Sequence, residues 1–250
     1  MAIKYGDRIM KRGVEGDDVA ELQLRLAGFR GTAPDGDFGP GTEMQVMMFQ
    51  RDVMKVNPDG IAGSATLKAI DTFARDYPIN WDQLKCRCGK CKGFGRGKYQ
   101  GKYRAGKAKI EAYHQYEYPG IHRMLLWASR AVRFYHSDLE FVFTSGYRCS
   151  EDNKQNGRSS TNHCGKAVDI DVILKPGEGK RDDMRRCDQL RGSLVEKSNA
   201  QIGWNARNRK SLEPSNIAPT WVHYDVRSYD QKYLKDEFFC TDTKSLDRPL

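Results

Sequence analysis

The sequence lacks any long apolar stretch. No run approaches the ~18 consecutive apolar residues that a transmembrane helix requires, and the mean hydropathy of the chain is −0.75. Residues 1–8 also lack the apolar segment of a secretory signal peptide. We therefore expect a protein without a membrane anchor that is synthesised in the cytoplasm, so that an extracellular substrate would require another route of export.

The chain also lacks the paired cysteines of a disulfide framework, because its seven cysteines are an odd number in a chain expected to fold in the cytoplasm. Three of them, Cys86, Cys88 and Cys91, lie close together in sequence. They could hold a structural zinc ion, with Cys149, Cys164 or a histidine as the fourth ligand. A disulfide and reduced buried thiols are the alternatives, since a lone Cys-x-Cys-x-x-Cys is only half of a standard zinc finger.

Acidic residues are absent from 85–109, where lysine, arginine and glycine are frequent. Glycine at this density disfavours a stable helix. We expect 76–110 to form a basic, glycine-rich linker or loop that can lie along an anionic polymer, with a solvated insertion as the alternative. The net charge of +9 also favours an anionic partner. Nucleic acid, membrane and bacterial cell wall all qualify, but no usual nucleic-acid-binding signature is present.

A length of 250 residues suits two domains, and an internal repeat marks the first domain, 1–75. Asp35-Gly-x-x-Gly-x-x-Thr42 recurs 24 positions further along as Asp59-Gly-x-x-Gly-x-x-Thr66. In each copy we expect the glycine turn to be followed by threonine at the N-cap of a helix with apolar periodicity. A further helix is expected after Gly16. The repeat therefore predicts a small all-α module of three helices.

The remainder, 111–250, is expected to form a second domain. Its apolar spacing predicts a helix over 121–135, and its β-propensity predicts a strand over 139–144 that ends at Ser145-Gly-Tyr-Arg148. A strand end after glycine can aim the Arg148 side chain into a cleft.

Two later runs alternate as half-buried strands do. In 167–173, Asp169 and Asp171 lie on the face opposite Val168, Ile170 and Val172, and in 221–227 His223 lies opposite Val222. If these strands are neighbours, an aspartate converges with His163 and His223. Two neutral imidazoles and a carboxylate leave a fourth position open, which is typical of catalytic zinc with metal-activated water as the nucleophile. Alternatively, His163 caps a turn and His223 is a buried, hydrogen-bonded residue.

The first module resembles the three-helix bacterial peptidoglycan-binding domain. The family pattern of Gly-x-x-Gly-x-x-Val-x-x-Leu-Gln, two Asp-Gly-x-x-Gly-x-x-Thr turns and an intervening Phe-Gln stands at Gly13–Gln23, Asp35–Thr42, Asp59–Thr66 and Phe49-Gln50. The resemblance implies peptidoglycan as the ligand. A generic helical domain with ordinary Gly-Asp turns is the alternative.

The second module resembles the zinc D-Ala-D-Ala carboxypeptidase/endopeptidase family of peptidoglycan peptidases. The similarity rests on Ser145-Gly-Tyr-Arg, on Ser-x-x-His-x-Gly-x-Ala-x-Asp at 160–169, and on Trp221-Val-His-x-Asp-Val-Arg. It implies an α+β fold with a small antiparallel sheet and helices on one side. It also implies zinc ligands and an oxyanion-stabilising cation, namely His163, Asp169, His223 and Arg148. We expect substrate contacts from Ser145, Tyr147 and Trp221.

Two departures from the family pattern concern the metal and the general base. One residue is missing before Gly165, so Asp169 follows His163 by six positions rather than seven, and Asp171 is the fallback ligand. Many family members carry an acidic residue three positions before the last histidine, but this chain has Thr220 there. We expect Asp225 to act as the base, with Glu213 as the other candidate, while Asp225 could instead orient a ligand histidine.

The predicted function is a zinc metallopeptidase, either a peptidoglycan endopeptidase or a D,D- or L,D-carboxypeptidase, and the modular, basic build resembles a bacteriophage endolysin. We expect it to act as a monomer on the cell wall or in the periplasm, without a specific nucleic-acid partner. A non-catalytic wall-binding or phage tail protein is the alternative, favoured by Thr220. A secreted bacterial wall-remodelling enzyme or toxin fits the same residues.

Overall fold

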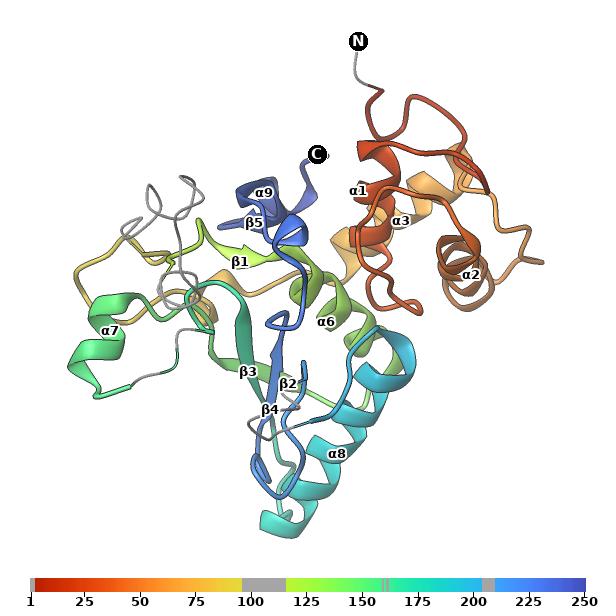
Figure 1. Cartoon of the computed structure of the whole chain (residues 1–250). Coiled ribbons are helices and arrows are strands. Elements are labelled where there is room, and N and C mark those ends of the chain that lie inside the picture. The colour runs from red at the N-terminus through yellow and green to blue at the C-terminus, as the bar shows by residue number, and fades with distance from the viewer. Residues whose placement is uncertain (1–2, 96–115, 159, 161, 204–209) are drawn as a thin grey trace.

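A computed structural model of the chain describes residues 3–95, 116–158, 160, 162–203 and 210–250. Figure 1 shows the arrangement of its elements. The described α-helices are α1 Asp17–Arg25, α2 Pro40–Phe49, α3 Ser64–Asp76, α6 Arg123–Tyr135, α7 Ser150–Gln155, α8 Lys180–Lys197 and α9 Thr243–Asp247. The described strands are β1 Ile121–His122, β2 Phe141–Ser145, β3 Ala167–Val172, β4 Val222–Asp225 and β5 Phe239–Cys240.

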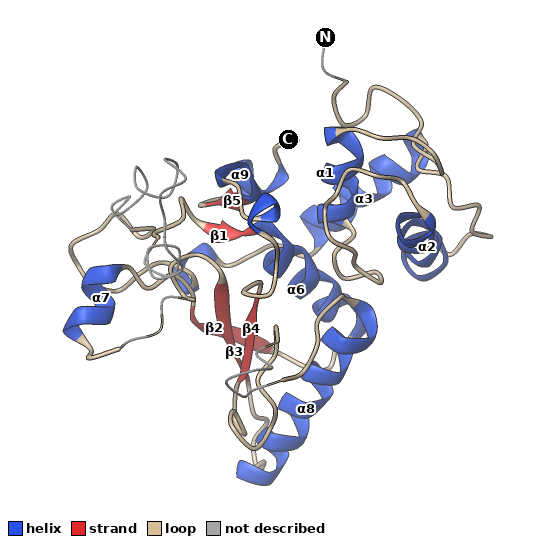
Figure 2. Cartoon of the chain, viewed as in Figure 1, coloured by secondary structure: helices blue, strands red, loops and turns tan. Residues whose placement is uncertain are grey.

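The architecture is α+β, as predicted. In Figure 2 the strands all lie in the second module, while the first is built from helices and loops. Within the described ranges no helix has both the length and the apolar character needed to cross a bilayer.

The three helices of the first module begin at glycine N-caps, Gly16, Gly39 and Gly63. The predicted threonine caps at Thr42 and Thr66 are therefore wrong. Each threonine lies within the first turn of its helix, where its hydroxyl has a different partner.

That partner is the side chain of a glutamine that precedes each turn in sequence and lies against it in space. The Gln23 amide nitrogen donates to Asp35 Oδ1 at 2.7 Å, to the Asp37 carbonyl at 3.0 Å and to Thr42 Oγ1 at 2.9 Å. Its Oε1 accepts the backbone N–H of Gly36 at 2.9 Å. Gln23 is buried, so these contacts satisfy a polar group that would otherwise be costly to remove from water.

Gln50 makes the same contacts in the second copy of the repeat. Its amide nitrogen donates to Asp59 Oδ1 at 2.7 Å and to Thr66 Oγ1 at 3.3 Å, and its Oε1 accepts the N–H of Gly60 at 3.0 Å. The sequence repeat is thus a repeated unit of one turn and one glutamine that fixes it.

The second module is organised on an antiparallel sheet in the order β2-β3-β4. In its register Asp169 lies opposite His223 on one side and opposite Ser145 on the other. Val168 and Ile170 of β3 are buried, and α8, which the sequence analysis did not predict, packs against β3 and β4. The polar face of the sheet is therefore the one that carries Asp169.

The C-terminal segment packs across the second module. Strand β5 pairs antiparallel with β1, and α9 follows it beside α1 and α6 in Figure 1. This places the end of the chain where the two modules meet.

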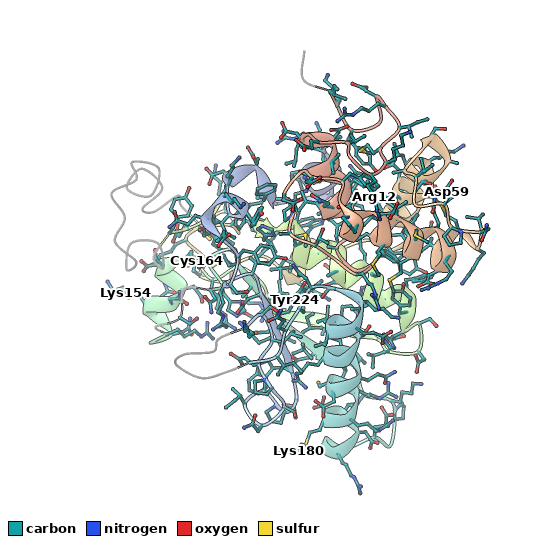
Figure 3. The ribbon with its side chains drawn as sticks, turned by 45° about the vertical axis from the view of Figure 1, so that its right-hand side comes forward. Arg12, Asp59, Lys154, Cys164, Lys180 and Tyr224 are labelled. Atoms are coloured by element: carbon teal, nitrogen blue, oxygen red, sulfur yellow. The ribbon has the colours of Figure 1, made fainter. Side chains whose placement is uncertain are left out.

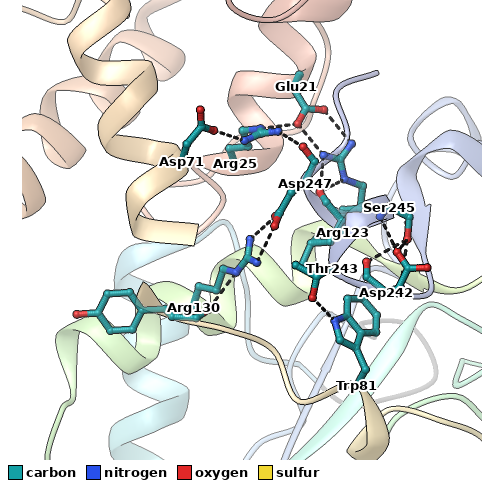
Figure 4. A network of polar contacts seen from close by, with 12 residues as sticks. Glu21, Arg25, Asp71, Trp81, Arg123, Arg130, Asp242, Thr243, Ser245 and Asp247 are labelled. Carbon is teal, nitrogen blue, oxygen red and sulfur yellow. Dashed lines mark hydrogen bonds and ion pairs between the residues drawn. The ribbon is translucent and has the colours of Figure 1, made fainter. Parts of the chain in front are cut away.

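Buried charges join the modules at that meeting point (Figure 4). Glu21 of α1 accepts two hydrogen bonds from Arg123 of α6, at 2.8 and 2.6 Å, and one from Arg25 at 2.6 Å. Arg123 also donates to the Leu246 carbonyl, at 3.0 and 2.7 Å. Arg123 and Glu21 are at most 1% exposed. The buried apolar residues of the two modules also form one continuous hydrophobic core.

A glycine allows the same close approach. Gly28, just after α1, lies against α6, and a Cβ at this position would lie 2.1 Å from the Cβ of Ala131. A larger residue at this position would therefore force α1 or α6 to shift.

The joint predicts a large effect of Arg123→Met. Because Glu21 would lose its bidentate partner inside the core, we expect a loss of roughly 3–5 kcal/mol in the free energy of unfolding, measured by urea denaturation. The control is Arg185→Met, which removes an exposed ion pair with Asp182 of 3.1 Å and should change stability by less than about 1 kcal/mol. Similar small effects of both variants would show that the joint does not stabilise the fold.

A second prediction concerns acid stability. His122 caps α6: its Nδ1 accepts the Met124 N–H at 3.3 Å, and its Nε2–H donates to the Tyr233 carbonyl at 2.9 Å. These partners specify the neutral ring, and burial lowers the pKa of His122 to about 4. At a pH between the folded-state pKa and the ordinary pKa of about 6.5, His122 is protonated in the unfolded chain but neutral in the folded protein. We expect roughly 3 kcal/mol of stability, present above pH ~6.5, to be lost as the pH falls toward 4.

The measurement is the free energy of unfolding across this pH range for wild type and His122→Asn, which keeps an oxygen at the cap. The slope should flatten in His122→Asn and persist in His136→Asn, a control at the partly exposed end of α6. An unchanged slope in His122→Asn would assign the pH dependence to other groups.

Candidate metal centre

Strands β3 and β4 and the turn before β3 bring His163, Asp169 and His223 together. Their ligand-capable atoms all lie within 4.8 Å of one another. His223 Nδ1 is 2.8 Å from Asp169 Oδ1, and His163 Nε2 is 3.3 Å from Asp169 Oδ2. Both histidines are buried.

The protonation of His163 indicates that this group can hold a cation. Its Nδ1–H donates to the Gly146 carbonyl at 2.9 Å, so the neutral ring directs the lone pair of Nε2 toward the Asp169 carboxylate. Burial lowers the pKa of His163, which opposes a second proton that would relieve this repulsion. Ligand atoms ~3.3 Å apart are what tetrahedral zinc with ~2.0–2.1 Å bonds requires, so the donor set fits zinc.

Asp225 prepares His223 for the same role. His223 Nε2 lies 2.8 Å from Asp225 Oδ2, which leaves Nδ1 as the nitrogen directed at Asp169. Burial alone would lower the pKa of His223, but hydrogen bonds to Asp169 and Asp225 raise it to about 9. A metal at Nδ1 would therefore displace a proton at neutral pH.

The cluster lies in a cavity of about 1130 Å³ on the polar face of the sheet. The lining mixes cations with carboxylates, namely Lys85, Arg87, Arg148, Arg158 and Arg227 with Asp152, Asp169, Asp171 and Glu213. Figure 3 shows the side chains of the described residues across the molecule: Cys164 and Tyr224 lie within the second module, while Lys154 and Lys180 lie at its outer surface.

The residues predicted to contact substrate all line this cavity. They are Ser145, Tyr147 and Trp221, and Arg148, the predicted oxyanion-stabilising cation, lines it too. Arg148 donates to Asp169 Oδ2 at 2.5 Å and to Ser145 Oγ at 2.6 Å, so its guanidinium lies beside the metal-binding group. Tyr147 is 2% exposed and donates to the Tyr118 carbonyl at 2.8 Å, so its hydroxyl is held inside the wall of the cavity.

The two candidate bases have opposite surroundings. Asp225 is 0% exposed and does not line the cavity. Its oxygens contact His223, the backbone N–H of Arg227 at 2.9 Å and the Arg227 side chain. Glu213 lines the cavity, and within the described part of the chain its carboxylate has no hydrogen bond or ion pair. Burial raises the pKa of Glu213.

Two other candidates lie outside the metal-binding group. Asp171 lines the cavity but accepts a hydrogen bond from Thr144 Oγ1 at 2.8 Å and does not reach the histidines. Cys164 donates to the Arg148 carbonyl at 3.2 Å, and burial raises the pKa of its thiol to about 12. Cys164 is therefore a protonated thiol at neutral pH, unsuited to nucleophilic attack.

Some of the lining was not predicted individually. Lys85 and Arg87 belong to the basic stretch, which had suggested polymer contact, whereas 96–115 lies outside the described residues. Asp152 and Arg158, which also line the cavity, form an ion pair of 2.9 Å. No pattern in the sequence marked this pair, because it depends on how α7 packs beside the cavity.

Comparison with known proteins supports the assignment of both modules. Residues 15–70 match the family model of the putative peptidoglycan binding domain. The chain is 30% identical over 169 residues to the zinc D-Ala-D-Ala carboxypeptidase of Streptomyces albus G, a match that covers 64% of this chain and 60% of that protein. The predicted resemblance to a modular peptidoglycan hydrolase is thereby confirmed.

Spore cortex-lytic enzymes are also similar to part of the chain. The enzyme of Bacillus subtilis (strain 168) is 33% identical over 75 residues, and that of Halalkalibacterium halodurans is 36% identical over 78 residues. Each match covers 29% of this chain, and 25% and 23% of the two enzymes. The chain thus spans about 60% of the carboxypeptidase and about a quarter of the cortex-lytic enzymes.

The geometry predicts a loss of zinc on Asp169→Asn. Asp169 contacts both histidines, so its amide variant should contain one equivalent of zinc fewer than wild type after dialysis, measured by inductively coupled plasma mass spectrometry. Asp171→Asn, two positions along the same strand face, is the matched control and should retain the wild-type content. Equal zinc in both variants would place the metal elsewhere.

Proposed function

We propose that this chain is a zinc-dependent peptidase that cleaves peptide bonds in bacterial peptidoglycan, held on that polymer by its first module. The observation that carries the proposal is the group of His163, Asp169 and His223 in a large polar cavity. The group offers three ligands, and catalytic zinc sites use three and keep a fourth position for water or substrate. The similarity to a zinc D-Ala-D-Ala carboxypeptidase and to a peptidoglycan-binding domain supports the substrate class.

Each polar residue around the metal-binding group has a separate task in this proposal. Zinc, when bound, would supply Lewis acidity at the scissile carbonyl and lower the pKa of water. Asp225 orients the His223 ring through Nε2. Arg148, which lies beside Asp169 at the cavity wall, stabilises the negative charge that develops on the carbonyl oxygen during attack.

Glu213 is the general base of the proposed reaction. A base must take a proton from the attacking water, so it needs a free carboxylate that faces the cavity and a pKa closer to neutrality. Glu213 meets these conditions through its place in the lining and the upward shift of its pKa by burial. Asp225, our first choice from the sequence, is enclosed by His223 and Arg227 and better suited to orientation.

The cavity also fits a substrate that carries carboxylates. Peptidoglycan stem peptides are acidic, and Lys85, Arg87 and Arg158 provide positive charge along the cavity lining in addition to Arg148. We extend the proposal to an endolysin-like role as a monomer, with a wall-binding domain over 1–75 and a peptidase domain over 111–250. The net charge of +9 suits an anionic wall.

The test is digestion of purified peptidoglycan, followed by mass spectrometry of the released muropeptides, with and without chelator. Wild type should cleave a peptide bond, whose identity separates endopeptidase from D,D- or L,D-carboxypeptidase activity, and chelator should abolish cleavage. Wild-type protein that contains zinc and binds peptidoglycan without cutting it would instead indicate a wall-binding structural protein.

The same assay tests the general base. Glu213→Gln should lower the cleavage rate by about 10²–10⁴-fold, the usual contribution of general base catalysis, while its zinc content stays at the wild-type level. Asp182→Asn, the same carboxylate-to-amide change at a partly exposed position at the start of α8, outside the cavity lining, should cleave at the wild-type rate. Full activity in Glu213→Gln would assign proton transfer to another group.

A further inference from the structure

A second cluster of metal-binding side chains lies outside the proposed catalytic group. Cys86, Cys88 and Cys91 follow the short 3-10 helix η2, Trp81–Gln83, and Cys149 comes from the N-cap of α7. Their four sulfur atoms all lie within 4.8 Å of one another. The sequence alone left the fourth member open among Cys149, Cys164 and a histidine. The fold selects Cys149.

The sulfur separations match a metal site. Cys88 Sγ and Cys149 Sγ are 3.5 Å apart, and no cysteine of the chain is in a disulfide. A disulfide would require ~2.05 Å between sulfurs. Four sulfurs placed tetrahedrally ~2.3 Å from a zinc ion are ~3.8 Å from one another. The observed spacing is close to the second value.

Backbone N–H groups are also directed at these sulfurs. Cys88 Sγ accepts from the N–H groups of Lys90 and Cys91, each at 3.3 Å. Cys86 Sγ accepts from Cys149 N–H at 3.4 Å. A neutral thiol is a weak acceptor, whereas a metal-bound thiolate carries the negative charge that such donors stabilise.

The turn between Cys88 and Cys91 is built for this pattern. Gly89 has φ of 69°, in the left-handed region that favours glycine. This conformation turns two successive amides back toward Cys88 Sγ. Glycine at position 89 therefore allows both the tight turn and the two N–H contacts with Cys88 Sγ.

We propose that Cys86, Cys88, Cys91 and Cys149 bind a structural zinc ion. Four protein ligands close the coordination sphere, which distinguishes this site from the open His163, Asp169 and His223 group. Four thiolates and one zinc ion carry a net charge of about −2, and the basic residues that interleave with the cysteines in 85–92 partly neutralise it.

The site would fix one rim of the substrate cavity. Lys85 and Arg87, which flank Cys86, line the cavity on one segment, and Arg148, which precedes Cys149, lines it on the other. The two segments also meet directly, since the Tyr147 N–H donates to the Leu84 carbonyl at 2.8 Å. A metal shared by both segments would hold the cationic side chains of this rim in place without taking part in the reaction.

The experiment separates the two metals. Wild type should contain two zinc equivalents per chain, Cys88→Ser and Asp169→Asn one each, and the double variant none. Cys187→Ser, a buried cysteine on α8 outside both groups, is the matched control and should retain two. Zinc content that is unchanged by Cys88→Ser would overturn the proposal. If only Asp169→Asn loses zinc, the chain binds the proposed catalytic metal but no metal at the cysteines.

Cobalt replacement identifies the ligands without relying on a variant that folds. Thiolate ligands give cobalt(II) an intense near-ultraviolet charge-transfer absorption that imidazole and carboxylate ligands do not. We expect this band in cobalt-loaded wild type and Asp169→Asn. Its absence from cobalt-loaded wild type would overturn the site.

Thiol titration addresses the remaining alternatives. Wild type unfolded in chelator should react at all seven cysteines, while the folded, zinc-loaded protein should protect the four ligands. Fewer than seven reactive thiols after unfolding without reductant would indicate disulfides. Rapid reaction of Cys86 and Cys91 in the folded, zinc-loaded protein would indicate free thiols. Either result contradicts a zinc site, as would iron in place of zinc.

Discussion

The register of strand β3 between β2 and β4 is the constraint on which the candidate site depends. Asp169 lies opposite Ser145 in one neighbour and His223 in the other. If β3 shifted by one residue relative to its neighbours, Asp169 would point toward the buried face and an aliphatic side chain would lie beside the histidines. The burial of Val168 and Ile170 on the opposite face opposes such a slip. The packing that buries Val168 and Ile170 therefore also brings the candidate metal ligands together.

Carboxylates acquire different tasks in this site through their surroundings alone. Asp169 lies between two imidazoles, where it can share a cation with them. Asp225 is enclosed by a histidine and an arginine, and on the proposed function it would orient His223. Glu213 has no hydrogen bond or ion pair among the described residues, and burial raises the pKa of its carboxyl group. The sequence shows only three acidic residues, because these differences come from three-dimensional contacts.

Local patterns predicted the features that local chemistry decides. The period-2 alternation predicted the strands and the shared face of Asp169 and His223, and the repeat predicted three helices. The threonine caps were wrong because Gln23 and Gln50, distant in sequence from their turns, bind the hydroxyls instead. Helix α8 was not predicted, and its sequence is highly charged with only a few buried apolar positions. The junction of the modules, the place of Glu213 and the partnership of Cys149 with the cysteine loop all depend on long-range packing.

The joint between α1 and α6 has a geometric consequence for the proposed function. Buried ion pairs and the glycine contact at Gly28 fix the direction in which the cavity faces relative to the first module. On the proposed function, attachment of one module to a glycan strand leaves the other with a set reach and a set angle. Such a molecule can cut only those bonds that lie at a fixed distance from the point where its first module binds. Accessibility in the polymer, as well as the chemistry of the bond, would then decide which cross-links are lost.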